Sequence, residues 1–359
     1  MAEHVAMYEW RGEGEETEIV LYAPDDPAFE HALPAAKLPG VESPVCAAAS
    51  PQGFGWAAAS ATHAAPDLLS IPLRSLLLVA GTRSENLGVP PQELMQRVLR
   101  ELPEAGARLP SLNESEASRL CESGAHAVAE DGLVEEEDLP LLDARPGDAD
   151  AIGRRALAAA PREWAGGVEP GFGLVTEVLD TEGAESLGLE KGALALVVRV
   201  EAGDLGRLAL VAHRERILSR VRSGDFGPTP DLPAAPAGSG EAEVLITALY
   251  AAANFADARA ARAVWMLRQV LGEAAGGLDI RAAWRTGGIE EQDGRLVHRR
   301  DLAWAESGHV LVCGSYAAAG TGNMWASAPS FGVPEEEGRW PWEEAGLLER
   351  LAMLDPPEG

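Results

Sequence analysis

Histidines are the residue type in this chain best suited to metal or acid–base chemistry, and their spacing does not predict a helical metal site. No two of them are three or four residues apart, the spacing that puts two imidazoles on one helix face. The seven are His4, His31, His63, His126, His213, His298 and His309. His298 is followed by Arg299 and Arg300, the densest basic spot in the chain. This spot predicts either a corner that binds phosphate or carboxylate, or a strand end whose arginines pair with acids.

Other reactive residue types lack the sequence context that their chemistry requires. Ser60 and Ser315 do not lie in a GxSxG motif, so a hydrolase triad has no support. The glycine-rich run 314–322 (GSYAAAGTG) lacks the GK[ST] ending of a phosphate loop and predicts a tight strand connection. Glu335–Glu337, with two later glutamates, predict either a cation site or, more commonly for such a run, a solvated acidic loop.

Composition indicates a cytoplasmic protein that does not bind nucleic acid directly. The net charge is −28, and a surface this acidic disfavours direct nucleic-acid binding, which depends on basic side chains. The first twenty residues carry acids where a signal peptide would have basic residues and an apolar run. No stretch approaches the roughly 20 apolar residues of a membrane helix. The three widely spaced cysteines suit thiols in a reducing compartment.

Hydrophobic patterning predicts strands and helices mixed without regular alternation, which favours an α+β fold. Strands are expected at 17–24, 75–80, 174–179, 194–200, 278–283, 294–298 and 309–314. Helices are expected at 90–102, 114–130, 148–160 and, most strongly, 241–271. Residues 207–221 predict a strand followed by a helix, and the Pro- and Gly-rich segment 222–240 predicts a flexible loop.

The C-terminal segment predicts a short amphipathic helix over 341–355, within a tail (341–359) that follows a domain spanning 1–340. Tryptophans beside an amphipathic helix either anchor a protein contact, such as a homodimer, or cover the domain's own core. The residues expected at such a contact are Trp340, Trp342, Leu347 and Leu351.

Several short segments, in order along the chain, resemble the RtcB family of GTP-dependent RNA ligases. Residues 124–139 (GAHAVAEDGLVEEEDL) are similar to the family's GA-x-WAVE-x-GY-x-x-EEDL stretch, and 251–256 (AAANFA) match its AANFA helix. Residues 170–205 resemble the run from its GSGNHFLEV motif to its HSGSRGLG motif. Further likenesses are 289–300 (IEEQDGRLVHRR) to its VHRKGATRA region, 310–315 (VLVCGS) to its VLIPGSMG strand, and 331–339 to its FGSTAHGAGR segment.

The resemblance implies a single α+β domain with a central β-sandwich flanked by helices. It also implies an ancestral chemistry in which manganese and GTP serve to join an RNA 3′-phosphate or 2′,3′-cyclic phosphate to a 5′-hydroxyl. In that family a histidine is guanylylated, and a cysteine, an aspartate and several histidines hold the metals. Such a site needs N and S donors that converge on one cavity.

When the resemblance is followed position by position, almost none of the family's metal ligands is retained. The family's DINCGVR falls on residues 68–74, so its aspartate becomes Leu68, its cysteine becomes Ile71, and only Arg74 is kept. The histidine of GSGNHF becomes Leu174 or Val175.

The remaining ligand positions are also altered. The histidine of HSGSRG becomes Arg199, and the AHN segment falls near Ala282. The nucleophile segment STAHGAGR falls within 333–339, where glutamates including Glu336 stand instead. Aliphatic side chains have no lone pair to donate, and a guanidinium would repel a cation.

We therefore predict a catalytically inactive RtcB-like protein that needs no cofactor and acts as a binding or regulatory partner, for example of an active RNA ligase. A second hypothesis is an enzyme with a repurposed cavity for an anionic or nucleotide ligand. Its candidate residues are Arg74, Arg199, His298, Arg299 and Arg300. A third is an active GTP-dependent ligase of the same family.

Overall fold

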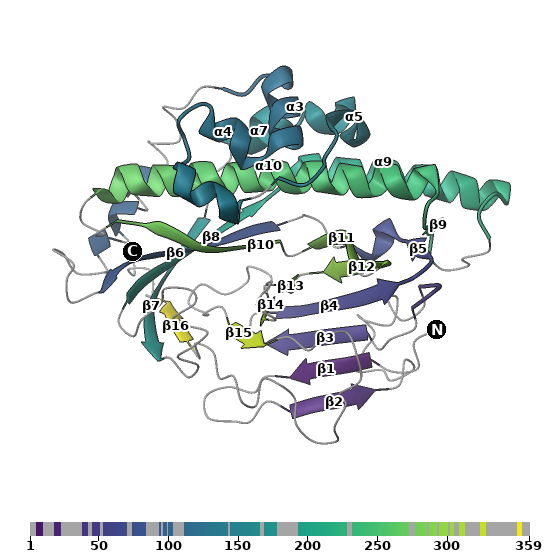
Figure 1. The fold of residues 1–359 in the computed structure, drawn as a ribbon, viewed down its shortest axis with the longest axis horizontal. Coiled ribbons are helices and arrows are strands. Elements are labelled where there is room, and N and C mark those ends of the chain that lie inside the picture. The colour runs from purple at the N-terminus through teal and green to yellow at the C-terminus, as the bar shows by residue number, and fades with distance from the viewer. Residues whose placement is uncertain are drawn as a thin grey trace.

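The structure, a computed structural model, gives backbone positions for most of the chain. The residues described are 5–9, 18–22, 38–41, 45–50, 53–69, 74–83, 93–94, 96–98, 100–102, 111–142, 144–165, 169–177, 193–227, 232–272, 277–285, 287–292, 294–300, 302–304, 309–312, 324–327 and 350–353. Within them, α-helices and β-sheets are mixed, as the hydrophobic pattern predicts (Figure 1).

Strands within these residues form two larger sheets and two smaller ones. The six-stranded sheet has the order β11 (Gly287–Gln292), β12 (Arg295–Arg300), β4 (Gly53–Ser60), β3 (Val45–Ser50), β1 (Val5–Glu9) and β2 (Glu18–Tyr22). The five-stranded sheet has the order β10 (Asp279–Arg285), β6 (Arg74–Arg83), β8 (Ala193–Glu201), β7 (Glu169–Glu177) and β16 (Arg350–Met353). The smaller sheets are β13 (Leu302–Trp304), β14 (His309–Val312) and β15 (Met324–Ser327), and the pair β5 (His63–Ala64) and β9 (Ala235–Pro236).

Strand β8 shows which face of the five-stranded sheet meets the core. Leu196, Val198 and Val200 occupy alternate positions, and each is almost fully buried. Because alternate residues of a strand share a face, these three define the side on which the long helix α10 (Gly240–Leu271) lies. The odd-numbered positions of β8 therefore belong to the opposite face of the sheet.

The long helix α10 confirms the strongest helix prediction. The side chain of Ser239 caps its first turn by accepting a hydrogen bond from the Ala242 N–H (3.3 Å), and the helix stops at Gly272, whose φ is +53°. All residues from 251 to 264 are buried, because the sheets lie on one side of α10 and the short helices on the other (Figure 1). No helix of the described residues is both long and apolar enough to cross a membrane.

Helix α9 (Gly203–Ser223) corrects the prediction for 207–221, because the expected strand is absent and the whole segment is helical. The apolar run at its start fits either kind of element when it is considered alone. The buried residues Leu205, Ala209, His213 and Ile217 recur every four positions, so a helix buries them on one face against α10. A strand would have placed the exposed residues Arg207, Val211 and Glu215 on that same face.

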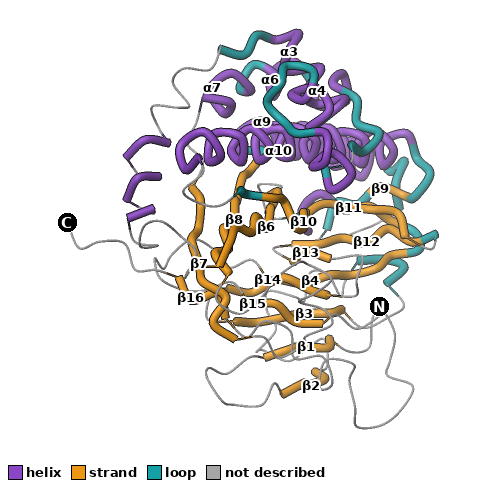
Figure 2. Tube along the Cα trace, turned by 60° about the vertical axis from the view of Figure 1, so that its left-hand side comes forward, coloured by secondary structure: helices purple, strands orange, loops and turns teal. Residues whose placement is uncertain are grey.

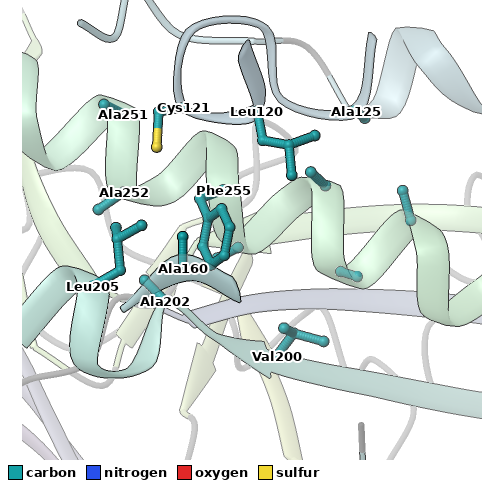
Figure 3. Close-up of a cluster of buried hydrophobic side chains, with 14 of the residues drawn as sticks. Leu120, Cys121, Ala125, Ala160, Val200, Ala202, Leu205, Ala251, Ala252 and Phe255 are labelled. Atoms are coloured by element: carbon teal, nitrogen blue, oxygen red, sulfur yellow. The ribbon is translucent and has the colours of Figure 1, made fainter. Parts of the chain in front are cut away.

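Short helices cover the side of α10 that faces away from the sheets, as Figure 2 shows from a second direction. They are α3 (Glu114–Ser123), α4 (Ala125–Ala129), α5 (Ala149–Ile152), α6 (Arg154–Leu157) and α7 (Ala160–Ala165), whereas the 3-10 turn η4 (Glu136–Leu141) lies between α4 and β10. Phe255 of α10 lies at the centre of this layer, with Leu120, Ala160 and Leu205 around it (Figure 3). The helices predicted at 114–130 and 148–160 are therefore present, as pairs or triplets of short helices.

Two predictions for the C-terminal half have a mixed outcome. Part of the predicted flexible segment 222–240 has a defined place, because Ala235 and Pro236 pair with β5. The helix predicted over 341–355 is wrong at Arg350–Met353, which form β16 on the edge of β7. Four residues are too few for their periodicity to distinguish a helix from a strand, and here they pair with the edge strand β7. Trp340, Trp342 and Leu347 lie outside the described residues.

Candidate functional site

Two of the residues that the RtcB resemblance places at ligand positions share one face of the five-stranded sheet. Arg199 pairs with Leu76 of β6, and two residues further along, Val197 pairs with Leu78, which in turn pairs with Ala282 of β10. Directly opposite residues share a face, and so do positions two apart on one strand. Arg199 and Ala282 therefore occupy neighbouring rows on the face that points away from α10.

The same register separates the two candidates for the third lost histidine. Glu169 of β7 pairs with Arg199, so the odd-numbered positions of β7 share the face of Arg199. Val175 belongs to this set, whereas Leu174 pairs with Leu194 and belongs to the α10 side. Of the two alternatives that the sequence leaves open, the backbone places Val175 with Arg199 and Ala282. Leu351 of β16, a predicted contact residue, pairs with Val175.

Arg74 lies next to Arg199 on this face. It opens β6 opposite Glu201, one row beyond the row of Arg199. Leu68 does not join them, because it lies in the 3-10 turn η2 (Pro66–Leu68) and is fully buried in the core. Ile71 and Glu336 lie outside the described residues, as do the side chains of Arg74, Arg199 and Arg300.

His298 belongs to the six-stranded sheet, and its ring is committed to the fold. The imidazole is fully buried, its Nδ1 lies 3.1 Å from the Leu296 carbonyl, and the N–H of Ala65 lies 3.0 Å from its Nε2. A ring that donates through Nδ1 and accepts through Nε2 is neutral. Burial lowers the pKa of His298 to about 4. The structure thus gives this histidine a structural role and leaves no ring nitrogen for the predicted anion contact.

Arg299 lies on the opposite face of β12 from His298 and forms an ion pair with Glu290 of β11. The Arg299 side chain is only 8% exposed, and the second oxygen of Glu290 lies 3.4 Å from the Arg145 guanidinium. The basic run 298–300 therefore does not form a single anion-binding corner. Its histidine and its first arginine face different sides of the sheet, and the arginine already has a carboxylate partner, as the alternative interpretation of this run predicts.

Asn254 in the AANFA segment has a structural role that the sequence did not reveal. Its amide nitrogen donates to the carbonyls of Cys121 (2.9 Å) and Arg145 (2.8 Å), and its oxygen accepts from the Arg145 N–H (2.9 Å). The side chain is fully buried. Since these bonds reach across 109 and 133 residues, they fix the short helices and their connections onto α10.

Sequence reasoning also missed two buried arginines in the middle of α10. Arg259 and Arg262 are 6% and 4% exposed. Arg259 donates to the carbonyl of Glu201, and Arg262 donates to the carbonyl of Trp164 and stacks over its ring at 4.6 Å. Burial lowers the pKa of both, that of Arg262 to about 10, with the charge of Arg259 as a further cause. The sequence does contain a signal for them, because the two arginines interrupt a helix that is apolar on several faces.

The residues that the RtcB resemblance places at ligand positions do not fit manganese or a guanylylated nucleophile. Leu68, Arg199 and Ala282 offer no lone pair to a cation, and His298 is used by the fold. In the described part of the chain, no group of three or more His, Cys, Asp or Glu side chains is arranged to hold a metal ion. No protein-family model matches this chain, and no curated protein matches it.

Proposed function

We propose that this chain is a non-catalytic relative of the RtcB ligases that acts in the cytoplasm by binding a protein partner or a second copy of itself. The observation that supports this best is the shared sheet face of Arg199 and Ala282. Two of the positions that a metal-dependent ancestor would need to converge, Arg199 and Ala282, lie in neighbouring rows, and they carry residues that cannot ligate a metal. The same proposal takes the two larger sheets, with α9 and α10 beside them, as the sandwich and flanking helices of that family.

A protein that has lost the catalytic residues at these positions could still function by binding another protein. A metal-free RtcB-like fold cannot activate a phosphate by Lewis-acid catalysis or present a guanylylated histidine. The hydrogen bonds of the buried Asn254 and His298 side chains would keep the scaffold folded without a catalytic site. An active ligase of the same family is one proposed partner, since related folds often assemble through shared surfaces.

A covalent-labelling experiment tests the loss of catalysis. The full chain is incubated with Mn²⁺ and GTP labelled at the α-phosphate, beside an active RtcB-type ligase as the positive control. We expect label on the control and none on this chain. A labelled chain, or joining of a 3′-phosphate RNA to a 5′-hydroxyl RNA, would contradict the proposal. Light scattering of the chain alone and mixed with the ligase then measures binding, and a monomer that forms no complex would contradict the contact role.

A specific observation also favours the second candidate function, a cavity for an anionic ligand. Arg74 and Arg199 occupy adjacent rows on one sheet face, with Glu201 and Glu169 directly opposite them on the neighbouring strands. His298 and Arg299 lie in the other sheet and do not contribute. Thermal stabilisation by nucleotides or small anions that the double change Arg74→Ala, Arg199→Ala abolishes would favour this function. Stabilisation that survives this change would count against it.

A further inference from the structure

Three exposed arginines lie at the junction where α6 packs against α9 (Figure 2). Arg154 and Arg155 belong to α6, and Arg216 belongs to α9. Arg216 lies one turn beyond His213, whose Nε2 is 2.8 Å from the carbonyl of Ala151. Ala151 in turn lies three residues before Arg154. The three arginines, which we call the arginine surface, therefore lie within a few residues of one contact between α9 and the short helices.

The charge of the arginine surface is not balanced within the chain. The chain has 57 Asp and Glu residues against 29 Lys and Arg residues, so carboxylates are abundant. Nevertheless, in the described part of the chain, none of the three arginines has an ion-pair partner. Ala212, one turn before Arg216, and Val211 are also exposed, the latter at 43%. The outer side of α9 thus combines unpaired positive charge with a small apolar area.

The turn η4 has the opposite charge and a similar apolar residue. Glu135–Glu137 are exposed, and Leu141, at the end of this turn, is 41% exposed. Arg268 lies 3.6 Å from the first of these carboxylates, whereas the other two have no ion-pair partner among the described residues. Within those residues, the exposed large apolar side chains are Leu141 and Val211. One of them therefore accompanies each of the two charged surfaces.

We propose that η4 of one copy of this chain docks on the arginine surface of a second copy. Glu136 and Glu137 pair with the three arginines, and Leu141 covers Val211 and Ala212. Opposite charge is the observation that selects the occupant, because complementary potentials determine which surfaces meet. The two surfaces belong to different elements, so the contact is heterologous, and its repetition builds a ring or a chain of copies. This inference rests on the proposed function, from which it takes the second copy as partner, and it adds the surfaces that meet.

Sedimentation velocity of the full chain over a range of concentrations tests the contact. At about 0.15 M salt the Debye length is about 8 Å, so the repulsion between copies of net charge −28 is largely screened. We expect association that increases with concentration. Arg155→Glu combined with Arg216→Glu should weaken this association at least about tenfold, because each change replaces an attraction by a repulsion. Arg97→Glu combined with Arg100→Glu is the matched control, since it changes the net charge equally at exposed positions elsewhere.

A mixing experiment tests whether the two surfaces contact each other. Glu136→Lys combined with Glu137→Lys reverses the charge of η4, and this variant should also fail to self-associate, although its net charge repels less. The Arg155/Arg216 variant retains a native η4, and the η4 variant retains a native arginine surface. Each supplies the surface that the other lacks, so we expect the two variants to form a complex when they are mixed. Circular dichroism of each variant verifies that it is folded.

Three results would overturn the proposal. They are an unchanged chain that stays monomeric at every concentration, an Arg155/Arg216 variant that associates as strongly as the Arg97/Arg100 control, and two complementary variants that form no complex when mixed. A chain that stays monomeric but binds an active RtcB-type ligase would contradict only this contact. Covalent labelling of the chain by GTP would instead contradict the proposed function.

Discussion

Asn254 and Arg145 hydrogen-bond to each other in both directions. The amide oxygen of Asn254 accepts from the backbone N–H of Arg145 at 2.9 Å, and its amide nitrogen donates to the carbonyl of the same residue at 2.8 Å. The Asn254 amide thus bonds both the N–H and the C=O of Arg145, the same two groups that a residue in a neighbouring β-strand would bond. The connection before α5 is thereby held against α10, where Gly147 approaches the backbone of Ala251 too closely for any side chain.

We expect Asn254→Ala to destabilise the protein by about 3 kcal/mol, because it removes the hydrogen bonds to both backbone groups of Arg145 and takes the side-chain donor away from the buried carbonyl of Cys121. Urea unfolding followed by circular dichroism measures the difference. Gln269→Ala is the matched control, since Gln269 is an exposed amide on the same helix and its loss should cost under about 0.5 kcal/mol. Equal stability of the two variants would refute the structural role of Asn254.

The buried imidazole of His298 predicts a specific loss of stability in acid. Its folded-state pKa of about 4 lies below the ordinary value of 6.5, so below pH 6.5 the unfolded chain takes up a proton that the folded chain excludes. The contribution is complete above pH 6.5 and is lost as the pH falls toward 4. Between pH 7 and pH 5 we expect His298 to account for about 2 kcal/mol of lost stability.

Urea unfolding at several pH values tests this prediction in His298→Gln, whose amide retains a donor and an acceptor without titrating. The stability of this variant should fall less between pH 7 and pH 5 than that of the unchanged chain. His63 and His213 also have pKa values lowered by burial and are present in both proteins, so the difference isolates His298. The exposed His126, changed to Gln, serves as the control. The same pH dependence in all three proteins would show that His298 is not a buried neutral group.

Gly203 should be sensitive to substitution for two separable reasons. Alanine there adopts a left-handed φ of +60° and displaces the carboxylate of Glu163, so we expect Gly203→Ala to cost about 2 kcal/mol in a thermal or urea unfolding experiment. Gly224, at the other end of α9, has a φ of +81° with open space around it, and Gly224→Ala should cost only about 1 kcal/mol.

Adding Glu163→Ala to the Gly203 variant removes the collision. The combined cost relative to Glu163→Ala alone should fall to that of Gly224→Ala. If the cost of Gly203→Ala were the same with and without Glu163, the carboxylate would not lie against the start of α9.

Long and strongly patterned elements could be predicted from the sequence, and elements that depend on distant partners could not. The apolar repeat of 241–271 and the aliphatic run of 194–200 correspond to α10 and β8, because each pattern has only one reasonable element. The start of α9 was misassigned because five apolar residues fit a strand as well as a helix. The chemistry of the site was harder still, since the neutral state of His298 depends on Ala65, 233 residues away.

The basic run at 298–300 illustrates the same limit on the site prediction. Adjacent charges look like one cluster in a sequence, yet a strand sends His298 and Arg299 to opposite faces, and only the pairing of β11 with β12 brings Glu290 to Arg299. Conversely, Arg199 and Ala282 are far apart in the chain and become neighbours through the register of β8, β6 and β10.

Calorimetric titration of Mn²⁺ into the full chain, after chelator treatment and with an active RtcB-type ligase titrated in parallel, tests the proposed loss of the metal site most directly. The account predicts stoichiometric binding to the ligase and only weak, non-saturating heat with this chain, from its acidic surface. One or more Mn²⁺ ions bound per chain with a defined stoichiometry would contradict it.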